Sequence, residues 1–253
     1  MIDVRTLASG LSRVESLTWM PSVSSTNTIG RRVIDECIEN EIILPFSVVV
    51  AGEQMSGRGR ESREWHSPFG RGIYSTVLLS RAKEEVSLLP LEIAIAVAGF
   101  LSEVYGIDAR IKWPNDIVAN GKKLAGILLE ARTHEETTFI AIGIGINVLP
   151  INNDATPLAG SIAELSKMES IDIDSATRAF VEFLDRDGLA FNRESIVDKW
   201  RALSALTKGD RVQCRVGDSE VSGLWEGIDD DGRALIRSGA RQLTIAAGDI
   251  IAQ

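Results

Sequence analysis

The sequence predicts an α+β protein in which a mixed β-sheet with flanking helices is followed by a small SH3-like β-barrel. Two patterns carry this prediction. Up to residue 205, apolar runs of strand length alternate with apolar residues at helical spacing. From residue 206 the pattern changes to short strands separated by turn residues. We therefore expect two domains, residues 1–205 and residues 206–253. A chain of 253 residues with 44% hydrophobic content is long enough for one sizeable core and a smaller second one.

The first predicted helix follows residues 24–27, SSTN, which are residue types that favour helix N-termini. Apolar residues from Ile29 to Ile38 then recur at helical spacing. We interpret the SSTN side chains as caps of this helix. The same hydroxyls and amide can also hold the polar end of a ligand at the helix N-terminus.

A pair of strands comes next and encloses a long loop. Residues 45–54, PFSVVVAGEQ, predict a buried strand that ends at Gln54, and residues 72–80, GIYSTVLLS, predict another. We expect the intervening loop to join two elements of one sheet. Residues 88–104 predict a helix that is apolar around much of its circumference, and we expect it to cover that sheet.

Residues 111–131 predict a β-hairpin, because Asn120–Gly121 stands between two apolar runs and is a preferred dipeptide of the type I′ turn. Lys122 and Lys123 open the second strand of this hairpin. Strict alternation of side chains lets only one of these lysines share the face of Ala125.

A further strand is predicted at residues 137–148. Gly126 in the hairpin, and Gly143 and Gly145 in this strand, weaken the pairing unless a ligand or another chain segment must approach the backbone closely. Two interpretations stay open: the glycines form the floor of a ligand site, or packing alone requires them.

Helix signals dominate the next part of the chain. Ser161 and Glu164 match a capping box, and Asp174 is the predicted cap of a helix that buries Phe180. Trp200 lies on the apolar face of the last predicted helix, and we assign it to the core. The barrel is predicted from four short strands, at residues 210–216, 220–228, 233–238 and 241–247.

The most distinctive stretch is residues 57–65, GRGRESREW, which we call the arginine loop. Its two glycines predict a turned or mobile backbone, and its three arginines offer planar charged groups suited to phosphate or carboxylate oxygens. A basic surface loop and an arm that binds single-stranded nucleic acid are the alternatives. The whole chain has 27 basic and 36 acidic residues, and this net charge of −9 favours a small anionic ligand over a polyanion.

Composition excludes several classes of site. Cys37 and Cys214 lie far apart, which argues against a disulfide framework or a zinc ribbon. His66 and His134 are isolated, so neither a metalloprotease motif nor a serine–histidine–aspartate triad has support. The arginine loop and residues 143–148 lack the glycine patterns of P-loop and dinucleotide-binding proteins.

The localisation that we expect is cytoplasmic. The first fifteen residues carry charges throughout and contain no apolar run of signal-peptide length. The most apolar later stretch, residues 88–104, is interrupted by Glu92 and Glu103, so we expect no membrane span.

Four blocks of the sequence, in their order and spacing, resemble the biotin protein ligases. The blocks are SSTN (24–27), GRGRESREW (57–65), KWPNDI (112–117) and KLAGILLE (123–130). GIGINV (143–148) and the final barrel extend the match over almost the whole chain from Ser22. The combination of GRGRxxRxW with KWPND and KLAG is highly specific. The resemblance implies a catalytic domain related to class II synthetases, followed by an SH3-like domain.

Members of that family join biotin to ATP as biotinyl-5′-AMP and then transfer the biotinyl group to a lysine of a biotin carboxyl carrier domain. The resemblance implies three overlapping groups of site residues. The catalytic group is Lys123, Arg58 and Arg60. The biotin-binding group is Ser25, Thr26, Asn27, Gln54, Gly57, Arg58, Lys123 and Gly126. The group that binds ATP or the adenylate is Arg58, Arg60, Arg63, Trp65, Asn115, Asp116, Lys123 and Asn147.

The resemblance also implies that Mg²⁺ accompanies the ATP. The sequence does not fix the ligands of this metal ion, and Asp116 is a candidate partner beyond its first coordination sphere.

Two departures from the family pattern affect these expectations. Only 21 residues precede Ser22, too few for the winged helix of the family's repressor-ligases, so we expect no binding of nucleic acid. Ser24 stands where many relatives have an aspartate, which puts the geometry of that helix start in question.

Three alternative functions are weighed against the ligase. A lipoate protein ligase shares the fold and the adenylate chemistry, but its RRxSGGG motif is absent. A non-catalytic nucleic-acid-binding protein is disfavoured by the net charge of −9. A protein that only sequesters biotin would have no use for Lys123 and the complete arginine loop.

Overall fold

The structure, a computed structural model, describes residues 8–151, 158–187, 189, 193–217 and 219–252. A seven-stranded sheet forms its centre, with the strand order β1-β2-β3-β7-β6-β5-β4. β1 runs parallel to β2, and the other neighbours are antiparallel. The strands are β1 (Ser16–Val23), β2 (Ser47–Gln54), β3 (Gly72–Ala82), β4 (Arg110–Lys112), β5 (Asp116–Ala119), β6 (Lys122–His134) and β7 (Thr137–Asn147).

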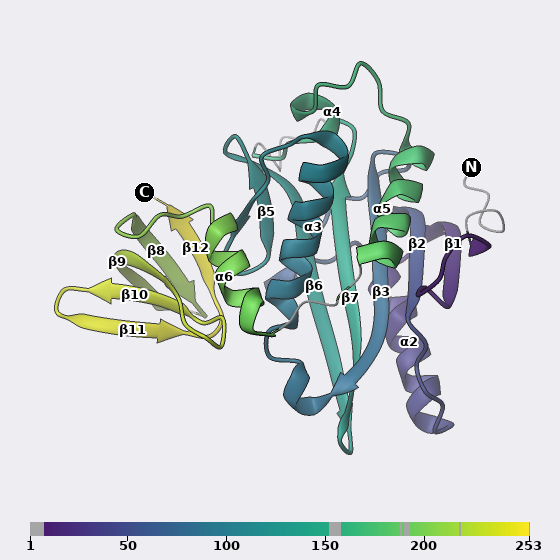
Figure 1. Ribbon diagram of the computed structural model, residues 1–253, viewed down its shortest axis with the longest axis horizontal. Helices are drawn as coiled ribbons and strands as arrows, with labels where there is room; N and C mark the ends of the chain where they lie inside the picture. The colour runs from purple at the N-terminus through teal and green to yellow at the C-terminus, as the bar shows by residue number, and fades with distance from the viewer. Residues whose placement is uncertain (1–7, 152–157, 188, 190–192, 218, 253) are drawn as a thin grey trace.

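The side chains of β7 alternate between a core face and an open face of this sheet. Its inward residues are almost fully buried in the larger hydrophobic core: Ile140, Ile142, Ile144 and Ile146. That core is completed by helices α3 (Leu89–Tyr105), α5 (Ile173–Asp187) and α6 (Arg193–Leu203), which lie on one side of the sheet (Figure 1).

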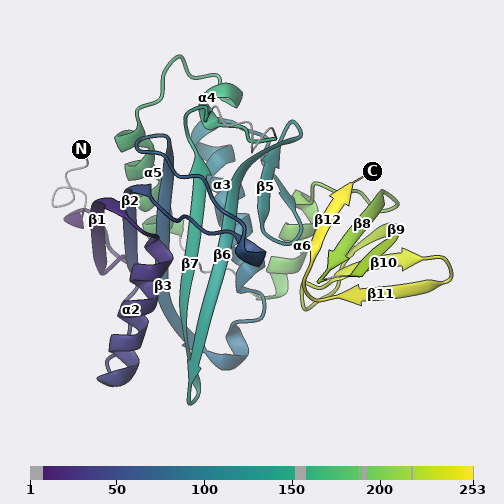
Figure 2. The same cartoon turned by 180° about the vertical axis from the view of Figure 1, so that it is seen from behind.

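The opposite face is covered in two parts. Helix α2 (Thr26–Glu39) packs Ile34 and Cys37 against Val49, Leu78 and Ala141 in a second, smaller core. Beyond the start of α2, the segment between β2 and β3 crosses β7 and β6 and includes the short 3₁₀-helix η1 (Arg60–Ser62) (Figure 2). A second 3₁₀-helix, η2 (Lys83–Glu85), follows β3.

Most of the predicted elements are confirmed. The arginine loop joins β2 and β3, which are antiparallel neighbours, and the helix expected at residues 88–104 is α3. Asn120 and Gly121 both have positive φ, at 50° and 75°, as a type I′ turn between β5 and β6 requires. The stretch 111–131 nevertheless holds three strands, because a second turn separates β4 from β5. β1 was not predicted.

Strict alternation would place Lys123 on the face of Ala125, but a bulge in β6 places it on the other face. The ladder between β5 and β6 shifts register, so that Ile117 pairs with Ala125 whereas Val118 pairs with Lys123. Leu124 is the extra residue of this bulge, and a bulge reverses the side on which the preceding side chain points. Ala125 is therefore buried in the core, whereas Lys123 projects onto the open face of the sheet.

The C-terminal part is a second, antiparallel sheet with five strands rather than the four predicted. Its strand order is β11-β10-β9-β8-β12, with β8 (Arg211–Val216), β9 (Ser219–Ile228), β10 (Ala234–Ser238), β11 (Arg241–Ile245) and β12 (Asp249–Ala252). It lies beside α6 and β5 (Figure 1). Trp113 Nε1 donates to the carbonyl of Gly232 at 3.0 Å, and Arg201 donates to the carbonyl of Ile228 at 2.8 Å. Side chains that precede the C-terminal sheet in the chain therefore bind the connection between β9 and β10.

The remaining helix caps are partly as predicted. Ser161 and Glu164 form the expected capping box at the short helix α4 (Ile162–Leu165). Asp174 was wrong as the cap of α5, because it lies inside the helix. Asp172 accepts from the backbone and the hydroxyl of Ser175 and caps the helix instead.

None of the helices among the described residues combines the length and apolar character that a membrane crossing requires.

A buried carboxylate attaches the segment before β1 to helix α5. Asp185 accepts hydrogen bonds from the backbone N–H groups of Ser12, Arg13 and Val14 at 2.9, 2.6 and 2.8 Å, and from the Ser12 hydroxyl at 3.1 Å. Burial alone would raise the pKa of this carboxyl, but these hydrogen bonds outweigh it and hold the pKa below its ordinary value.

We predict that Asp185→Asn lowers the free energy of unfolding at pH 7 by about 1–3 kcal/mol, because the amide cannot accept this set of bonds. The pKa of the folded state lies below that of the unfolded state, so this stability is complete above roughly pH 4 and is lost as the pH falls further. Urea unfolding of both proteins from pH 7 downward measures the difference.

Asp198→Asn is the matched control, since that carboxylate is 80% exposed and pairs with Arg201 within the same helix. It should change stability by less than about 1 kcal/mol. Equal stability of wild type and Asp185→Asn at pH 7 would show that Asp185 does not secure the segment.

Candidate functional site

A pocket lies on the open face of the seven-stranded sheet, between the start of α2, the arginine loop and β12. Its floor is formed by the three glycines that the sequence singled out. A Cβ added to Gly145 would come closer than 3.0 Å to the indole of Trp65, and one added to Gly143 would lie 2.5 Å from Asn27 Oδ1. Gly126 stands opposite Gly145 in the β6–β7 ladder, and its Cβ would lie 3.0 Å from the same indole. The glycines therefore make room for side chains inside the pocket.

The polar end of the pocket is built around Gln54, the last residue of β2. Its Oε1 accepts from the backbone N–H and the hydroxyl of Thr26 at 2.9 and 3.1 Å, and its Nε2 donates to Ser67 Oγ at 3.0 Å. Ser25 occupies the N-cap position of α2, but its side chain makes no capping hydrogen bond. Gln54 thus performs the capping expected of SSTN, and the buried Ser25 hydroxyl is left facing the pocket.

Asn27 is held by protein partners on both sides of its amide. Its Oδ1 accepts from the Thr76 hydroxyl at 2.6 Å, and its Nδ2 donates to Glu130 Oε2 at 2.9 Å. Arg58 approaches the same carboxylate at 3.7 Å and the Thr28 hydroxyl at 3.4 Å. Glu130 therefore links the start of α2 to the first arginine of the loop.

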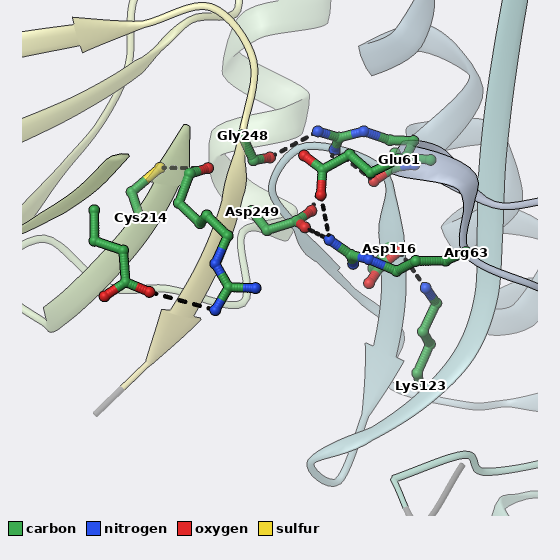
Figure 3. Close-up of polar contacts among 11 residues, drawn as sticks. Glu61, Arg63, Asp116, Lys123, Cys214, Gly248 and Asp249 are labelled. Carbon is green, nitrogen blue, oxygen red and sulfur yellow. Dashed lines mark hydrogen bonds and ion pairs between the residues drawn. The ribbon is translucent and has the colours of Figure 1, made fainter. Parts of the chain in front are cut away.

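Lys123 enters the pocket from β6. Its Nζ lies 2.6 Å from Asp116 Oδ1 (Figure 3). The same atom lies 5.3 Å from the centroid of the Trp65 ring. Its backbone is fixed as well, because Lys123 N donates to the carbonyl of Leu158 at 2.8 Å and its own carbonyl accepts from Gly160 N at 2.9 Å. The ammonium therefore projects from a segment whose main chain is bonded on both sides.

Arg60 and Arg63 reach from the arginine loop to the C-terminal sheet. Arg60 donates to Asn115 Oδ1 at 3.2 Å and to the carbonyl of Gly248 at 2.9 Å, and it lies 3.7 Å from Asp249. Arg63 pairs with Asp249 and, at 2.7 Å, with Glu61 (Figure 3). Burial lowers the pKa of Arg60 from its ordinary value, although the guanidinium stays charged at any physiological pH.

The Trp65 indole fills much of the space above the glycine floor. Its Nε1 is buried and makes no hydrogen bond within the described residues, which costs about 1–3 kcal/mol. The pocket that remains has a volume of about 120 Å³. Small-molecule sites commonly measure about 300–1,000 Å³. A ligand of that size therefore requires the indole and the arginine loop to move.

The structure gathers most of the predicted site residues. Those that line the pocket are Ser25, Thr26, Asn27, Gln54, Arg58, Arg60, Arg63, Trp65, Asn115, Asp116, Lys123 and Gly126. Gly57 is the first residue of the arginine loop, and its carbonyl accepts from Trp65 N at 2.9 Å. Asn147 lies at the end of β7, where its Nδ2 faces the carbonyl of Lys123 at 3.4 Å. Both are outside the pocket lining in this conformation.

Sequence reasoning missed three residues that order the pocket. Glu130 is the last residue of the KLAGILLE block and was given no role. Thr76 is one polar residue within an apolar strand, and Asp249 stands far from every motif, so only the folded chain reveals their positions.

Among the described residues, no group of three or more His, Cys, Asp or Glu side chains forms a metal cluster.

The chain is similar to known proteins over most of its length. A family model described as the biotin/lipoate A/B protein ligase family matches residues 19–147, and one described as the biotin protein ligase C-terminal domain matches residues 208–252. The biotin–[acetyl-CoA-carboxylase] ligase of Paracoccus denitrificans is 34% identical over 219 residues, which are 80% of this chain and 88% of that protein. The bifunctional ligase/repressor BirA of Bacillus subtilis is 34% identical over 215 residues, 81% of this chain, and the match spans 65% of that relative.

A solved structure has a similar fold over almost the whole chain. The biotin protein ligase from Aquifex aeolicus in complex with biotin and ATP superimposes with a TM-score of 0.70 and 25% sequence identity. The superposition covers 94% of this chain and 99% of that one.

We predict that Gly145→Ala displaces the Trp65 indole from the floor of the pocket, because the new methyl group would occupy the position of the ring. The intrinsic fluorescence of the protein should shift to longer wavelength as the indole meets water. The same substitution in a Trp65→Phe background should produce no shift, which isolates Trp65 from the other four tryptophans.

Gly99→Ala is the matched control, since a Cβ there would meet only the ring of Phe183, at an ordinary 3.6 Å. Its emission should equal that of the wild type. An unshifted spectrum for Gly145→Ala would mean that the ring does not rest on Gly145.

Proposed function

Because this chain belongs to the biotin/lipoate A/B protein ligase family, we propose that it is an ATP-dependent biotin protein ligase. Its first reaction joins the carboxylate of biotin to the α-phosphate of ATP, which gives biotinyl-5′-AMP and releases pyrophosphate. Its second reaction transfers the biotinyl group to the amine of a lysine, forms an amide and releases AMP.

The observation that carries this proposal is the meeting of four cationic side chains above a glycine floor. Arg58, Arg60, Arg63 and Lys123 all line one pocket whose far end is polar and uncharged. A triphosphate and a carboxylate both need cations, whereas the ureido ring of biotin needs hydrogen-bonding groups without net charge. The pocket supplies both kinds of environment.

Lys123 is the residue that we assign to the chemical step. A carboxylate and a triphosphate repel each other, and a fixed ammonium between them reduces that repulsion and stabilises the charge that develops during transfer. The ion pair with Asp116 and the hydrogen-bonded main chain hold this ammonium in position before the substrates arrive. Little reorganisation is then required during the reaction.

We assign the uncharged end of the pocket to the biotin ring. Ser25, Thr26 and Gln54 supply two hydroxyls and an amide, and Gly57 and Arg58 lie at the start of the loop that would close beside the ring. Gly126 leaves room on the floor. Asn27 keeps its predicted place in this group, and its bonds to Thr76 and Glu130 support a role in positioning the start of α2.

The nucleotide is assigned to the arginine side of the pocket. Arg60, Arg63 and Asn115 would bind its phosphates, Trp65 would cover an apolar ring once the loop has moved, and Asn147 would support this end of the sheet. Closure of the loop would exclude water from the mixed anhydride, which hydrolyses readily.

Mg²⁺ would arrive with the ATP. Proteins commonly bind this ion through substrate phosphates and waters together with one or two carboxylates. Asp116, one of the three carboxylates that line the pocket, would accept from a water of the ion, beyond its first coordination sphere. When bound, the ion would neutralise part of the phosphate charge.

The acceptor that we propose is a lysine of a biotin carboxyl carrier domain of a biotin-dependent carboxylase. The Paracoccus relative is named for biotinylation of acetyl-CoA carboxylase. Within this proposal, the chain has a catalytic domain, residues 1–205, that binds biotin and ATP, and a C-terminal domain, residues 206–253.

We predict that the purified protein, given ATP, Mg²⁺ and an equal mixture of biotin and lipoate without an acceptor, forms biotinyl-AMP as the only adenylate. Mass spectrometry of the reaction identifies the product. Lipoyl-AMP as the main product would show that the substrate is lipoate and not biotin. The absence of both adenylates would contradict the assignment of Lys123 and the arginine loop.

We also predict that Lys123→Ala reduces the rate of adenylate formation by about 10²–10³-fold without changing the midpoint of thermal unfolding, because one preorganised charge is removed. Lys122→Ala is the matched control. That neighbouring lysine pairs with Glu164 at 3.1 Å, away from the pocket, and its loss should leave the rate within about two-fold of wild type. Near-normal turnover by Lys123→Ala would remove this lysine from the mechanism.

A further inference from the structure

A carboxylate of the C-terminal sheet enters the pocket and binds two arginines of the loop. Asp249 is the first residue of β12, yet it pairs with Arg63 (Figure 3) and with Arg60, which precede it by more than 180 residues. Its side chain is only 23% exposed, and it lines the pocket together with Lys123. Neither the sequence motifs nor the chemical step proposed above gives this residue a role.

The backbone around Asp249 fixes the position of the carboxylate. Asp249 pairs with Arg215 in the β8–β12 ladder. A Cβ on the preceding Gly248 would lie 2.5 Å from the carbonyl oxygen of Arg215, so this close approach requires glycine. The carbonyl of Gly248 is thereby turned towards Arg60, from which it accepts a hydrogen bond at 2.9 Å. The sheet therefore presents two acceptors to the arginine loop from one rigid strand end.

Two guanidinium groups that meet on one carboxylate form a binding site for an anion. Carboxylate and phosphate oxygens suit the same planar donors, so a phosphate group and Asp249 compete for Arg60 and Arg63. Glu61 also pairs with Arg63, but it belongs to the loop and moves with it. Asp249 is the partner that connects the loop to a different part of the fold.

We propose that Asp249 is a positioning residue that takes the place of an anionic group of the nucleotide between Arg60 and Arg63. It holds the arginine loop at the pocket until the nucleotide displaces it and holds the loop there more tightly. This inference rests on the proposed function, because the displacing group is a phosphate of ATP or the released pyrophosphate. The carboxylate has two effects: it secures the substrate-free loop, and it weakens the binding of phosphate.

The test is limited digestion of the substrate-free protein with trypsin, followed by mass spectrometry of the cut after Arg58. This arginine does not touch Asp249, so its cleavage reports the release of the loop. Asp249→Asn should accelerate the cut by about two- to five-fold, the range that a partly exposed ion pair supports. The concentration of inorganic pyrophosphate that halves the cleavage rate should fall by a similar factor.

Two further variants make the result specific. Asp230→Asn is the matched control, because Asp230 also lies in the C-terminal part of the chain but pairs with Arg201 and not with the arginine loop. This variant should be digested at the same rate as the wild type. Arg63→Gln should also release the loop, but it should raise the pyrophosphate concentration required, because it removes a cation instead of a competing anion. Arg63→Gln carries the test if Asp249→Asn unfolds at a lower temperature than the wild type.

Unchanged cleavage in Asp249→Asn would overturn the proposal, and so would an unchanged or higher pyrophosphate requirement, which is the result for a merely structural contact. Neither measurement uses biotin or catalysis. A protein that forms no biotinyl-AMP yet shows both effects would therefore refute the proposed function and leave the role of Asp249 intact.

Discussion

The balance of charge within one pocket is the constraint on which the rest of the site depends. Arg58, Arg60, Arg63 and Lys123 would repel one another if they were left unpaired, and each instead lies beside a carboxylate. These carboxylates come from β5, β6, β12 and the loop itself. The cations can be concentrated in one place only because the tertiary fold brings those elements together. These carboxylates keep the cations in position when no ligand is bound. An anionic substrate would enter the pocket by replacing them.

The seven-stranded sheet makes this concentration of charge compatible with a stable core. Along β7, large isoleucines fill the core on one face, and alanine or glycine stands at every intervening position from 141 to 145. The same period of two therefore produces a tightly packed interior and a bare floor from one short sequence. The bulge at Leu124 completes the separation, because it turns Lys123 onto the open face while Ala125 remains in the core.

Local features of the sequence predicted most of the fold, and long-range contacts account for what was missed. The Asn120–Gly121 turn and the apolar run of α3 depend on neighbouring residues, so both were foreseen. The capping of α2 by Gln54 was not, because the preferred local cap, Ser25, is replaced by a side chain from another strand. Asp249 gave no signal at all, since a single aspartate in a short strand acquires meaning only when the chain has folded. The motif residues of the pocket were found because each motif combines unusual residue types over a few positions.

One contribution opposes the observed conformation of the loop, and several favour it. The unpaired Trp65 N–H costs about 1–3 kcal/mol, whereas ion pairs as exposed as that of Arg63, whose side chain is 54% exposed, contribute at most about 1 kcal/mol each. A substrate that provides an acceptor for the indole would remove that cost, and its phosphates would replace the carboxylates beside the arginines. The ion pairs that hold the arginine loop at the pocket are therefore contacts that an anionic substrate can replace.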